Sequence, residues 1–151
     1  MESEVVDGLD VSICVIDLKY NVLMFSGAMH NLYLTHDGEL IELKGNRIPI
    51  GGIASGVTTR FTTQMHLLYP DLKIYMSTDG YFDQFSGTTI KKFSKNRFRK
   101  LLLDMKDMPF EQQKSYLWKQ HKDWQSTATQ TDDVCVFGCS VKDILKNNQR
   151  N

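Results

Sequence analysis

Two acidic stretches, far apart along the chain, each border an apolar segment that predicts a β-strand. The first is Asp79-Gly80, which follows the β-prone segment from Leu72 to Ser77. The second is Asp132-Asp133, which precedes an apolar segment from Val134 to Val141. Carboxylates held at rigid strand ends and open to solvent suit hard cations, which bind through oxygen. Asp-Gly after a strand is also a common turn signal, and that simpler interpretation stays open.

Composition and charge narrow the class of protein. The chain has 151 residues, 41% hydrophobic and 24% charged, which suits one globular domain with its own core. Its 18 basic and 18 acidic side chains balance, so charge gives no general affinity for nucleic acid or an anionic membrane. The basic run from Lys91 to Lys100 is a candidate phosphate contact, or else the solvated face of a helix.

Cysteine usage and the lack of a long apolar run indicate the compartment. Cys14, Cys135 and Cys139 lie in strand-like apolar segments, which favours small buried residues in a reducing environment over disulfides or a zinc site. No apolar run approaches the ~18 residues of a membrane span, and the acidic N-terminus is unlike a signal peptide. We therefore expect a cytoplasmic protein.

Alternating apolar residues in the first half of the chain predict an antiparallel meander. Strands are expected at residues 11–18, 22–28, 32–35, 39–43, 58–68 and 72–77, with loop-like sequence from Gly45 to Gly56. Asp37-Gly38 supplies the turn chemistry of a tight hairpin.

The period changes after Phe85. Phe98, Leu101, Leu102 and Met105 recur at helical spacing and predict an amphipathic helix. Pro109 opens a second predicted helix, with an apolar stripe of Phe110, Tyr116, Leu117, His121 and Trp124. Trp118 falls off that stripe, and we expect it to pack on a neighbouring loop. A meander, two covering helices and a closing strand make an α+β fold.

Five runs of sequence, taken together, carry a resemblance to a known family. They are Asp7-Gly8-Leu9-Asp10-Val11-Ser12-Ile13-Cys14-Val15-Ile16-Asp17, Gly27-Ala28 with Leu32-Tyr33-Leu34, Pro49-Ile50-Gly51, Thr78-Asp79-Gly80-Tyr81-Phe82-Asp83-Gln84-Phe85, and Asp132-Asp133. In this order and spacing the chain resembles the bacterial SpoIIE-like branch of the metal-dependent type 2C (PPM) serine/threonine protein phosphatases. The resemblance covers about residues 7 to 140.

The resemblance implies a fold, a cofactor and site residues. The family fold is a four-layer α-β-β-α sandwich that holds two Mg²⁺ or Mn²⁺ ions at one end of its paired sheets. By position, Asp79 and Asp132 resemble the family's metal-binding aspartates. Gly80 and Asp133 are weaker candidates for the same metal site. No protein nucleophile is implied, since the ions supply a metal-activated water, and the sequence has no phosphate-binding glycine loop and no Cys-His signature.

The sequence also departs from the family pattern at its start. In the family an earlier segment carries an Asp-Gly-x-Gly-His-Gly motif, whose aspartate bridges both metals, whereas only residues 1–6 precede the resemblance here. We therefore expect a short leader at 1–6, a SpoIIE-like domain at 7–141 without the family's N-terminal part, and a polar tail at 142–151. Such a chain would supply about half of the sandwich and bind a divalent ion weakly, because affinity rises with the number of charged oxygen ligands. Half of a sandwich would also expose the apolar sheet face that the other half buries, and the candidates for part of that face are Leu23, Phe25, Ile41, Met65 and Tyr75.

Three interpretations follow. The chain is a phosphoserine/phosphothreonine phosphatase that is weak or inactive alone and gains activity when another chain or self-association completes it. Alternatively, it is a non-catalytic phosphatase-like module in bacterial signalling, which binds a phosphoprotein or a regulatory partner. The third interpretation is a stable α+β remnant without activity. None of the three involves nucleic acid or a membrane as a partner.

Overall fold

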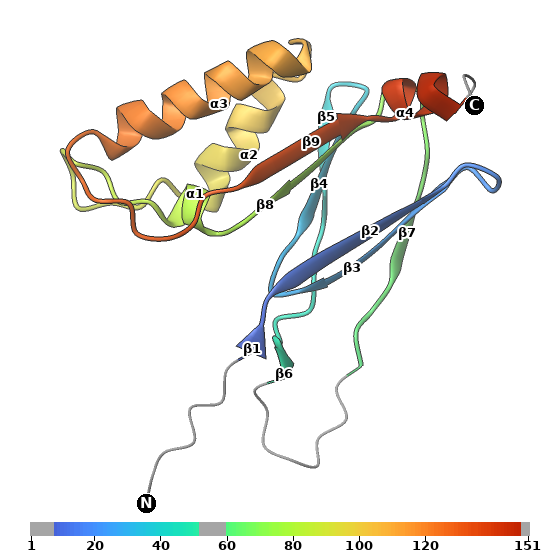
Figure 1. Ribbon diagram of the computed structural model, residues 1–151, viewed down its shortest axis with the longest axis horizontal. Coiled ribbons are helices and arrows are strands. Elements are labelled where there is room, and N and C mark those ends of the chain that lie inside the picture. The colour runs from blue at the N-terminus through green and yellow to red at the C-terminus, as the bar shows by residue number, and fades with distance from the viewer. Residues whose placement is uncertain (1–7, 52–59, 149–151) are drawn as a thin grey trace, which may run out of the picture. The chain divides into compact units, whose positions relative to one another are not determined.

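The computed structural model describes residues 8–51 and 60–148. The elements in chain order are β1 (Gly8–Leu9), β2 (Val11–Asp17), β3 (Val22–Ala28), β4 (Leu32–His36), β5 (Glu39–Leu43), β6 (Ile50–Gly51), β7 (Gln64–Leu67), β8 (Lys73–Ser77), α1 (Gly80–Asp83), α2 (Lys95–Asp104), α3 (Phe110–Gln125), β9 (Val136–Ser140) and α4 (Val141–Asn148) (Figure 1). The chain divides into two units, residues 1–32 with 42–68 and residues 33–41 with 69–151. None of the described helices is long and apolar enough to cross a membrane.

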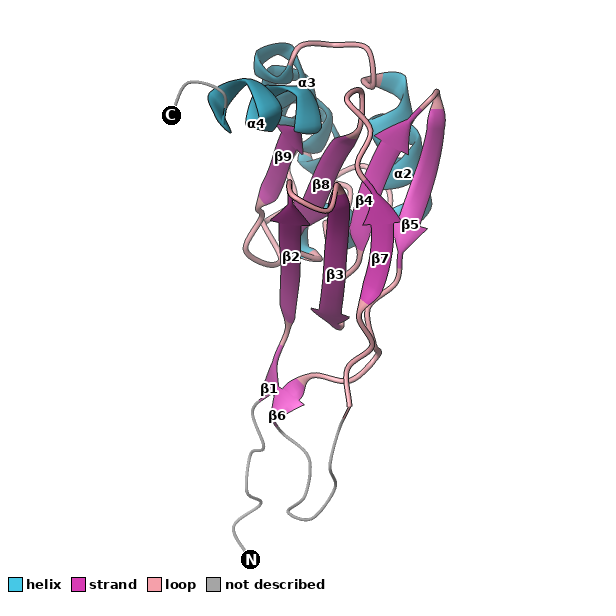
Figure 2. Ribbon diagram, turned by 90° about the vertical axis from the view of Figure 1, so that its right-hand side faces the viewer, coloured by secondary structure: helices cyan, strands magenta, loops and turns pink. Residues whose placement is uncertain are grey.

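The first unit contains a three-stranded antiparallel sheet in which β3 lies between β2 and β7 (Figure 2). β2 and β3 form the predicted hairpin, with Val15 opposite Met24 and Asp17 opposite Val22. β7 pairs with β3 so that Met65 also lies opposite Met24. β1 and β6 pair separately; β6 lies in the stretch from Gly45 to Gly56 that we expected to be loop, and β1 precedes the first predicted strand. The predicted strand over 58–68 is shorter, because residues 60–63 form no strand and residues 58–59 lie outside the described part of the chain.

One face of this sheet carries exposed apolar side chains. Ile13 and Val15 of β2 are 55% and 48% exposed, and Met65 and Leu67 of β7 are 67% and 56% exposed. Strand residues two apart share a face, and the register places Val15 and Met65 on either side of Met24. We call these four residues the open face.

The residues of the open face differ from those that we expected to be exposed. Leu23, Phe25 and Tyr75 are at most 1% exposed, so their assignment to an exposed face is wrong, and Ile41 is only half-buried. Met65 was assigned correctly. Successive residues of a strand point to opposite faces. Leu23 and Phe25 therefore lie on the buried face of β3, and the residues next to them in the strand point to the opposite face.

The second unit contains a four-stranded sheet in the order β5-β4-β8-β9. The β4–β5 hairpin and the β8 strand occur as predicted, and β9 pairs antiparallel with β8. Residues of the sheet and of α2 share one aromatic core, in which Phe98 is fully buried against Tyr33 and Tyr81 at ring distances of 5.5 and 5.1 Å. Both predicted helices are present, and the α+β class is confirmed.

The position of Trp118 and the structure after β9 differ from expectation, the first because of a neighbouring side chain and the second because of a helix cap. Trp118 is 60% exposed and lies under Lys122 instead of a loop, with Nζ 4.7 Å from the ring centre. The stretch expected as a polar tail is helical from Val141 to Asn148, because the Ser140 hydroxyl caps the helix by accepting from the Asp143 amide at 3.1 Å. Residues 149–151 and the predicted leader at 1–6 lie outside the described residues.

The three cysteines form no disulfide, and not all of them are buried. Cys14 and Cys139 are half-buried, and burial raises the pKa of the Cys139 thiol. Cys135 is exposed, contrary to the expectation that it packs in the core. It directly precedes β9, and one residue separates it from the Asp132-Asp133 stretch.

Candidate functional site

The two acidic stretches meet at one end of the second unit's sheet. In the β8–β9 ladder Ser77 lies opposite Val136. The ladder continues one step further, since the Thr78 amide donates to the Cys135 carbonyl at 3.0 Å. Because antiparallel neighbours run in opposite directions, the residues that follow β8 lie beside those that precede β9. The sheet therefore brings Asp79 next to the Asp132-Asp133 stretch, although 53 positions separate Asp79 from Asp132 in the sequence.

The two strand ends lie in close contact at Gly80. A Cβ atom at this position would lie 2.9 Å from the carbonyl carbon of Asp133, nearer still to its oxygen, and 3.2 Å from the carbonyl carbon of Asp132. Only glycine leaves the two backbones room to touch in this way. Gly80 is also the first residue of α1, so the chain turns from strand to helix at this contact.

The acidic side chains at this end are accessible. Asp79 is partly buried, and within the described residues its carboxylate has no hydrogen-bond or ion-pair partner. Asp132 and Asp133 are exposed, and one Asp132 carboxylate oxygen accepts from the Asp133 amide at 2.6 Å. Asp83, at the end of α1, is engaged elsewhere in a 3.0 Å ion pair with Lys92.

These residues fit part of a divalent-metal site. Carboxylate oxygens are the ligands that Mg²⁺ and Mn²⁺ prefer, and the backbone contact at Gly80 holds their strand ends together. In residues 8–51 and 60–148, however, no three histidine, cysteine or acidic side chains are placed to hold one ion. The described residues therefore supply an incomplete ligand set.

A family model covers the part of the chain that carries both acidic stretches. The model for Stage II sporulation protein E (SpoIIE) matches residues 4–142. The chain belongs to the SpoIIE family. No curated protein matches its sequence.

Solved structures place the SpoIIE-family chain among type 2C phosphatase domains. The SiaA-PP2C domain of Pseudomonas aeruginosa is 30% identical with a TM-score of 0.79, and the match covers 87% of this chain and 51% of that one. The phosphatase domain of Bacillus subtilis SpoIIE, presoaked with Mn, is 11% identical with a TM-score of 0.65, covering 87% and 56%. The Mycobacterium tuberculosis serine/threonine phosphatase PstP/Ppp is 14% identical with a TM-score of 0.58, covering 89% and 60%. The chain thus spans about half the length of these structures.

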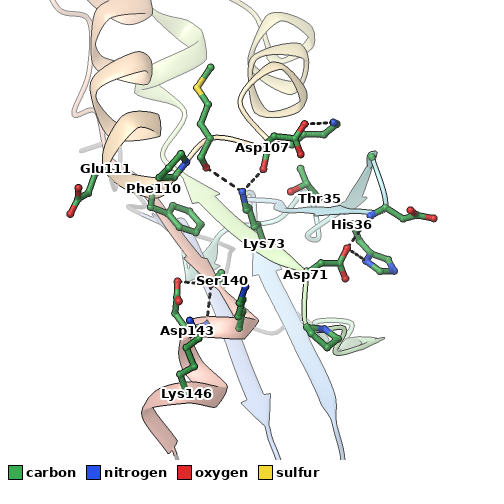
Figure 3. A pocket seen from close by; sticks show the side chains of 17 residues that line it. Thr35, His36, Asp71, Lys73, Asp107, Phe110, Glu111, Ser140, Asp143 and Lys146 are labelled. Carbon is green, nitrogen blue, oxygen red and sulfur yellow. Dashed lines mark hydrogen bonds and ion pairs between the residues drawn. The ribbon is translucent and has the colours of Figure 1, made fainter.

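The SpoIIE-family chain also has a cavity at the other end of β8, which carries different chemistry. Figure 3 shows this cavity, of about 520 Å³, with Lys73 on one side and the start of α4 on another. Burial lowers the pKa of Lys73, whose ammonium donates to the carbonyls of Lys106 and Met108. Ser140 and Asp143 bond to each other, as do His36 and Asp71. These polar groups satisfy one another, and the cavity contains none of the predicted site residues.

A second hollow of about 580 Å³ lies between α3 and β9 of the SpoIIE-family chain, with Trp118 and His121 in its lining. His121 is 1% exposed, and neither ring nitrogen has a hydrogen-bond partner in the described part of the chain. Burial, followed by the charge of Lys122, lowers the pKa of His121. The sequence predicts His121 only as a member of the apolar stripe of a helix. That its ring nitrogens have no hydrogen-bond partner among the described residues is visible only in the structure.

Sequence reasoning missed one residue near the SpoIIE-family site. Gln84, at the end of α1, is fully buried, and its side chain bonds to the loop that leads to Asp132. It occurs inside the run Thr78–Phe85 that supports the family assignment. Its place among Tyr81, Phe82 and Phe85 was the available signal, since an amide buried among aromatic side chains requires hydrogen-bond partners.

Proposed function

We propose that this chain belongs to a metal-dependent phosphoserine/phosphothreonine protein phosphatase, and that Asp79 and Asp132 contribute ligands to its metal centre. The observation that carries the proposal is the meeting of the two acidic strand ends at Gly80. The SpoIIE family and the type 2C fold support the same class of function. Asp133, beside Asp132, and the backbone carbonyl of Gly80 are further candidate ligands.

The chemistry follows from the type of ligand. When bound, divalent ions such as Mg²⁺ or Mn²⁺ bind phosphate oxygens and activate a water for attack, which is consistent with the Mn-presoaked relative. The chain's own part is to hold carboxylates at fixed strand ends that solvent and substrate reach. No cysteine, serine or histidine of this chain is needed as a nucleophile in such a reaction.

The incomplete ligand set affects how tightly the chain binds metal and how fast it hydrolyses a substrate. Hard-cation affinity rises with the number of charged ligands and with the rigidity of the site. We propose that the described residues bind metal weakly and hydrolyse phosphate esters slowly, and that further carboxylates complete the site, from the rest of the protein, from another chain or by self-association. The substrate would be a phosphoprotein in a bacterial signalling system.

A second candidate function is a non-catalytic phosphatase-like module that binds a phosphoprotein or a regulatory protein. The absence of any three-ligand cluster from the described residues favours this alternative. Phosphate release distinguishes the two functions, because the module would retain the fold and release no phosphate.

A Mn²⁺ titration tests the proposed function. The backbone amide signals of Asp79, Gly80, Asp132 and Asp133 are followed by NMR while phosphate release from a phosphoserine peptide is measured in the same sample. We expect paramagnetic broadening at both strand ends, lost in Asp79→Asn and retained in Asp104→Asn, which removes an exposed carboxylate from α2. Broadening with phosphate release supports the phosphatase, and broadening alone supports the module. The proposal fails if the two ends do not respond together up to millimolar Mn²⁺.

A further inference from the structure

The loop that carries Asp132 is held to the segment that carries Asp79 at two separate points. One point precedes Asp132 in the sequence and the other follows it. Both anchoring side chains, Gln84 and Thr78, come from the short segment that surrounds Asp79. We call the loop of residues 129–135 the acidic loop.

Thr78 anchors the C-terminal side of the acidic loop through its hydroxyl. Its Oγ1 donates to the Asp133 carbonyl at 2.8 Å and accepts from the Cys135 amide at 2.9 Å. The Thr78 amide donates to the Cys135 carbonyl at 3.0 Å. Thr78 thus continues the hydrogen bonding between the two segments beyond Ser77 and Val136, the last regular pair of β8 and β9.

Gln84 anchors the N-terminal side of the acidic loop. Its side-chain amide nitrogen donates to the Thr129 carbonyl at 2.9 Å, and its carbonyl oxygen accepts from the Thr131 amide at 3.4 Å. The backbone carbonyl of Gln84 accepts from the indole of Trp124 at 3.0 Å. Gln84 is 0% exposed, so its position is fixed by packing as well as by these bonds.

We infer that Thr78 and Gln84 are positioning residues that clamp the acidic loop and thereby hold Asp132 beside Asp79. This inference rests on the proposed metal site. The residues on either side of Asp132 are both bonded to the clamp, Thr131 to Gln84 and Asp133 to Thr78, whereas the Asp132 side chain is exposed and bonds to neither anchor. Gly80 contributes by allowing the loop backbone to approach.

The physical effect of the clamp is on the entropy of binding. A ligand on an exposed loop must be ordered when an ion binds, and ordering its backbone costs conformational entropy. A loop already tied at both ends has lost most of that freedom on folding, so metal affinity gains from the pre-ordering. The clamp touches neither carboxylate, and its loss leaves the ligand chemistry unchanged.

The Thr78 anchor is tested by Thr78→Val, which keeps the shape and removes the hydroxyl. We expect amide hydrogen exchange across residues 131–134 to rise about fivefold, the ratio for one net hydrogen bond, and Mn²⁺ affinity to fall by a similar factor. Thr78→Ser should restore both values, because it returns the hydroxyl. The control is Ser77→Ala, which removes a neighbouring hydroxyl that bonds only to the Thr78 carbonyl.

The Gln84 anchor is tested by Gln84→Met, with Gln113→Met as its matched control. Gln113 is also a buried glutamine, at 1% exposed, and it bonds to the Tyr75 hydroxyl and the carbonyls of Met105 and Met108 instead of the acidic loop. We expect both variants to unfold at lower temperature. Only Gln84→Met should increase exchange in residues 129–134 at temperatures where the protein is folded, and only it should weaken Mn²⁺ broadening at Asp132.

The outcomes separate the clamp from the proposed function. If Thr78→Val and Gln84→Met match their controls in local exchange, the clamp is refuted. If they increase exchange but leave a measurable Mn²⁺ affinity unchanged, the acidic loop is tethered without consequence for metal, and the inference is again refuted. If the wild-type chain binds no Mn²⁺, the proposed metal site fails while the exchange comparison still decides whether the two residues hold the loop.

Discussion

Gly80 faces the peptide group of Asp133 so closely that no side chain fits between them. This contact joins the start of α1 to the loop before β9, across 53 residues of sequence. Both residues adjoin an aspartate of the candidate metal site. The contact is therefore the point where the fold of the second unit fixes the spacing of its acidic residues.

Replacing Gly80 with alanine should separate the two strand ends. The added Cβ would meet backbone atoms, which cannot rotate away, so we expect a loss of about 2 kcal/mol in the free energy of unfolding. Urea denaturation measures the loss, and amide shifts at Asp133 report the local movement. Gly38→Ala is the control, since its cost of about 1 kcal/mol comes from a positive φ of 79°, and its Cβ would meet only the Lys106 side chain at an ordinary contact distance of 3.9 Å. Unchanged Asp133 shifts in Gly80→Ala would contradict the prediction.

The aromatic core of the second unit should depend on Phe98. This ring is fully buried and contacts Tyr33, Tyr81 and Phe82. Phe98→Ala should lower the free energy of unfolding by about 3–5 kcal/mol, because it removes the ring and leaves a cavity. Ile90→Ala, at a side chain 96% exposed, should change it by less than about 0.5 kcal/mol. Similar denaturation midpoints for the two variants would show that α2 does not pack as described.

The stability of the protein should decrease in mild acid because of His121. Burial lowers the pKa of this imidazole, so below its ordinary pKa the unfolded chain binds more protons than the folded one. The stabilisation is complete above about pH 6.5 and is lost as pH falls through the lower pKa of the folded state. Denaturation midpoints from pH 7 to pH 5 test this, with His121→Phe as the comparison. Equal pH dependence in the two proteins would exclude His121 as the cause.

The open face of the first unit should promote association. Ile13, Val15, Met65 and Leu67 expose apolar surface together, which costs free energy in water and favours contact with another apolar surface. We expect light scattering to show a mass that rises with concentration, and Val15→Thr combined with Met65→Thr to reduce that rise. Ile90→Thr removes a single exposed apolar side chain elsewhere and should not. A mass independent of concentration in the unaltered chain would contradict this expectation.

Local pattern predicted most of the secondary structure. The β2–β3 and β4–β5 hairpins, β8, α2 and α3 occur where alternation, turn residues and helical spacing place them. The prediction missed short helices and strands whose formation depends on contacts with other residues. β1, β6 and α1 are too short for a period to be visible, and α4 depends on the bond between Ser140 and Asp143. The burial of Leu23 and Phe25 required knowledge of which face of β3 is covered.

The sequence by itself determined the family, the α+β class and the candidate carboxylates Asp79 and Asp132, because motif order and residue chemistry are properties of the chain. Only the tertiary structure decided that these aspartates share one end of a sheet, since that depends on the β8–β9 register. It also decided that Thr78 and Gln84 hold the acidic loop and that the described residues gather fewer than three ligands for one ion. Long-range pairing arises from packing and hydrogen bonds between distant segments, and no local pattern in the sequence specifies it.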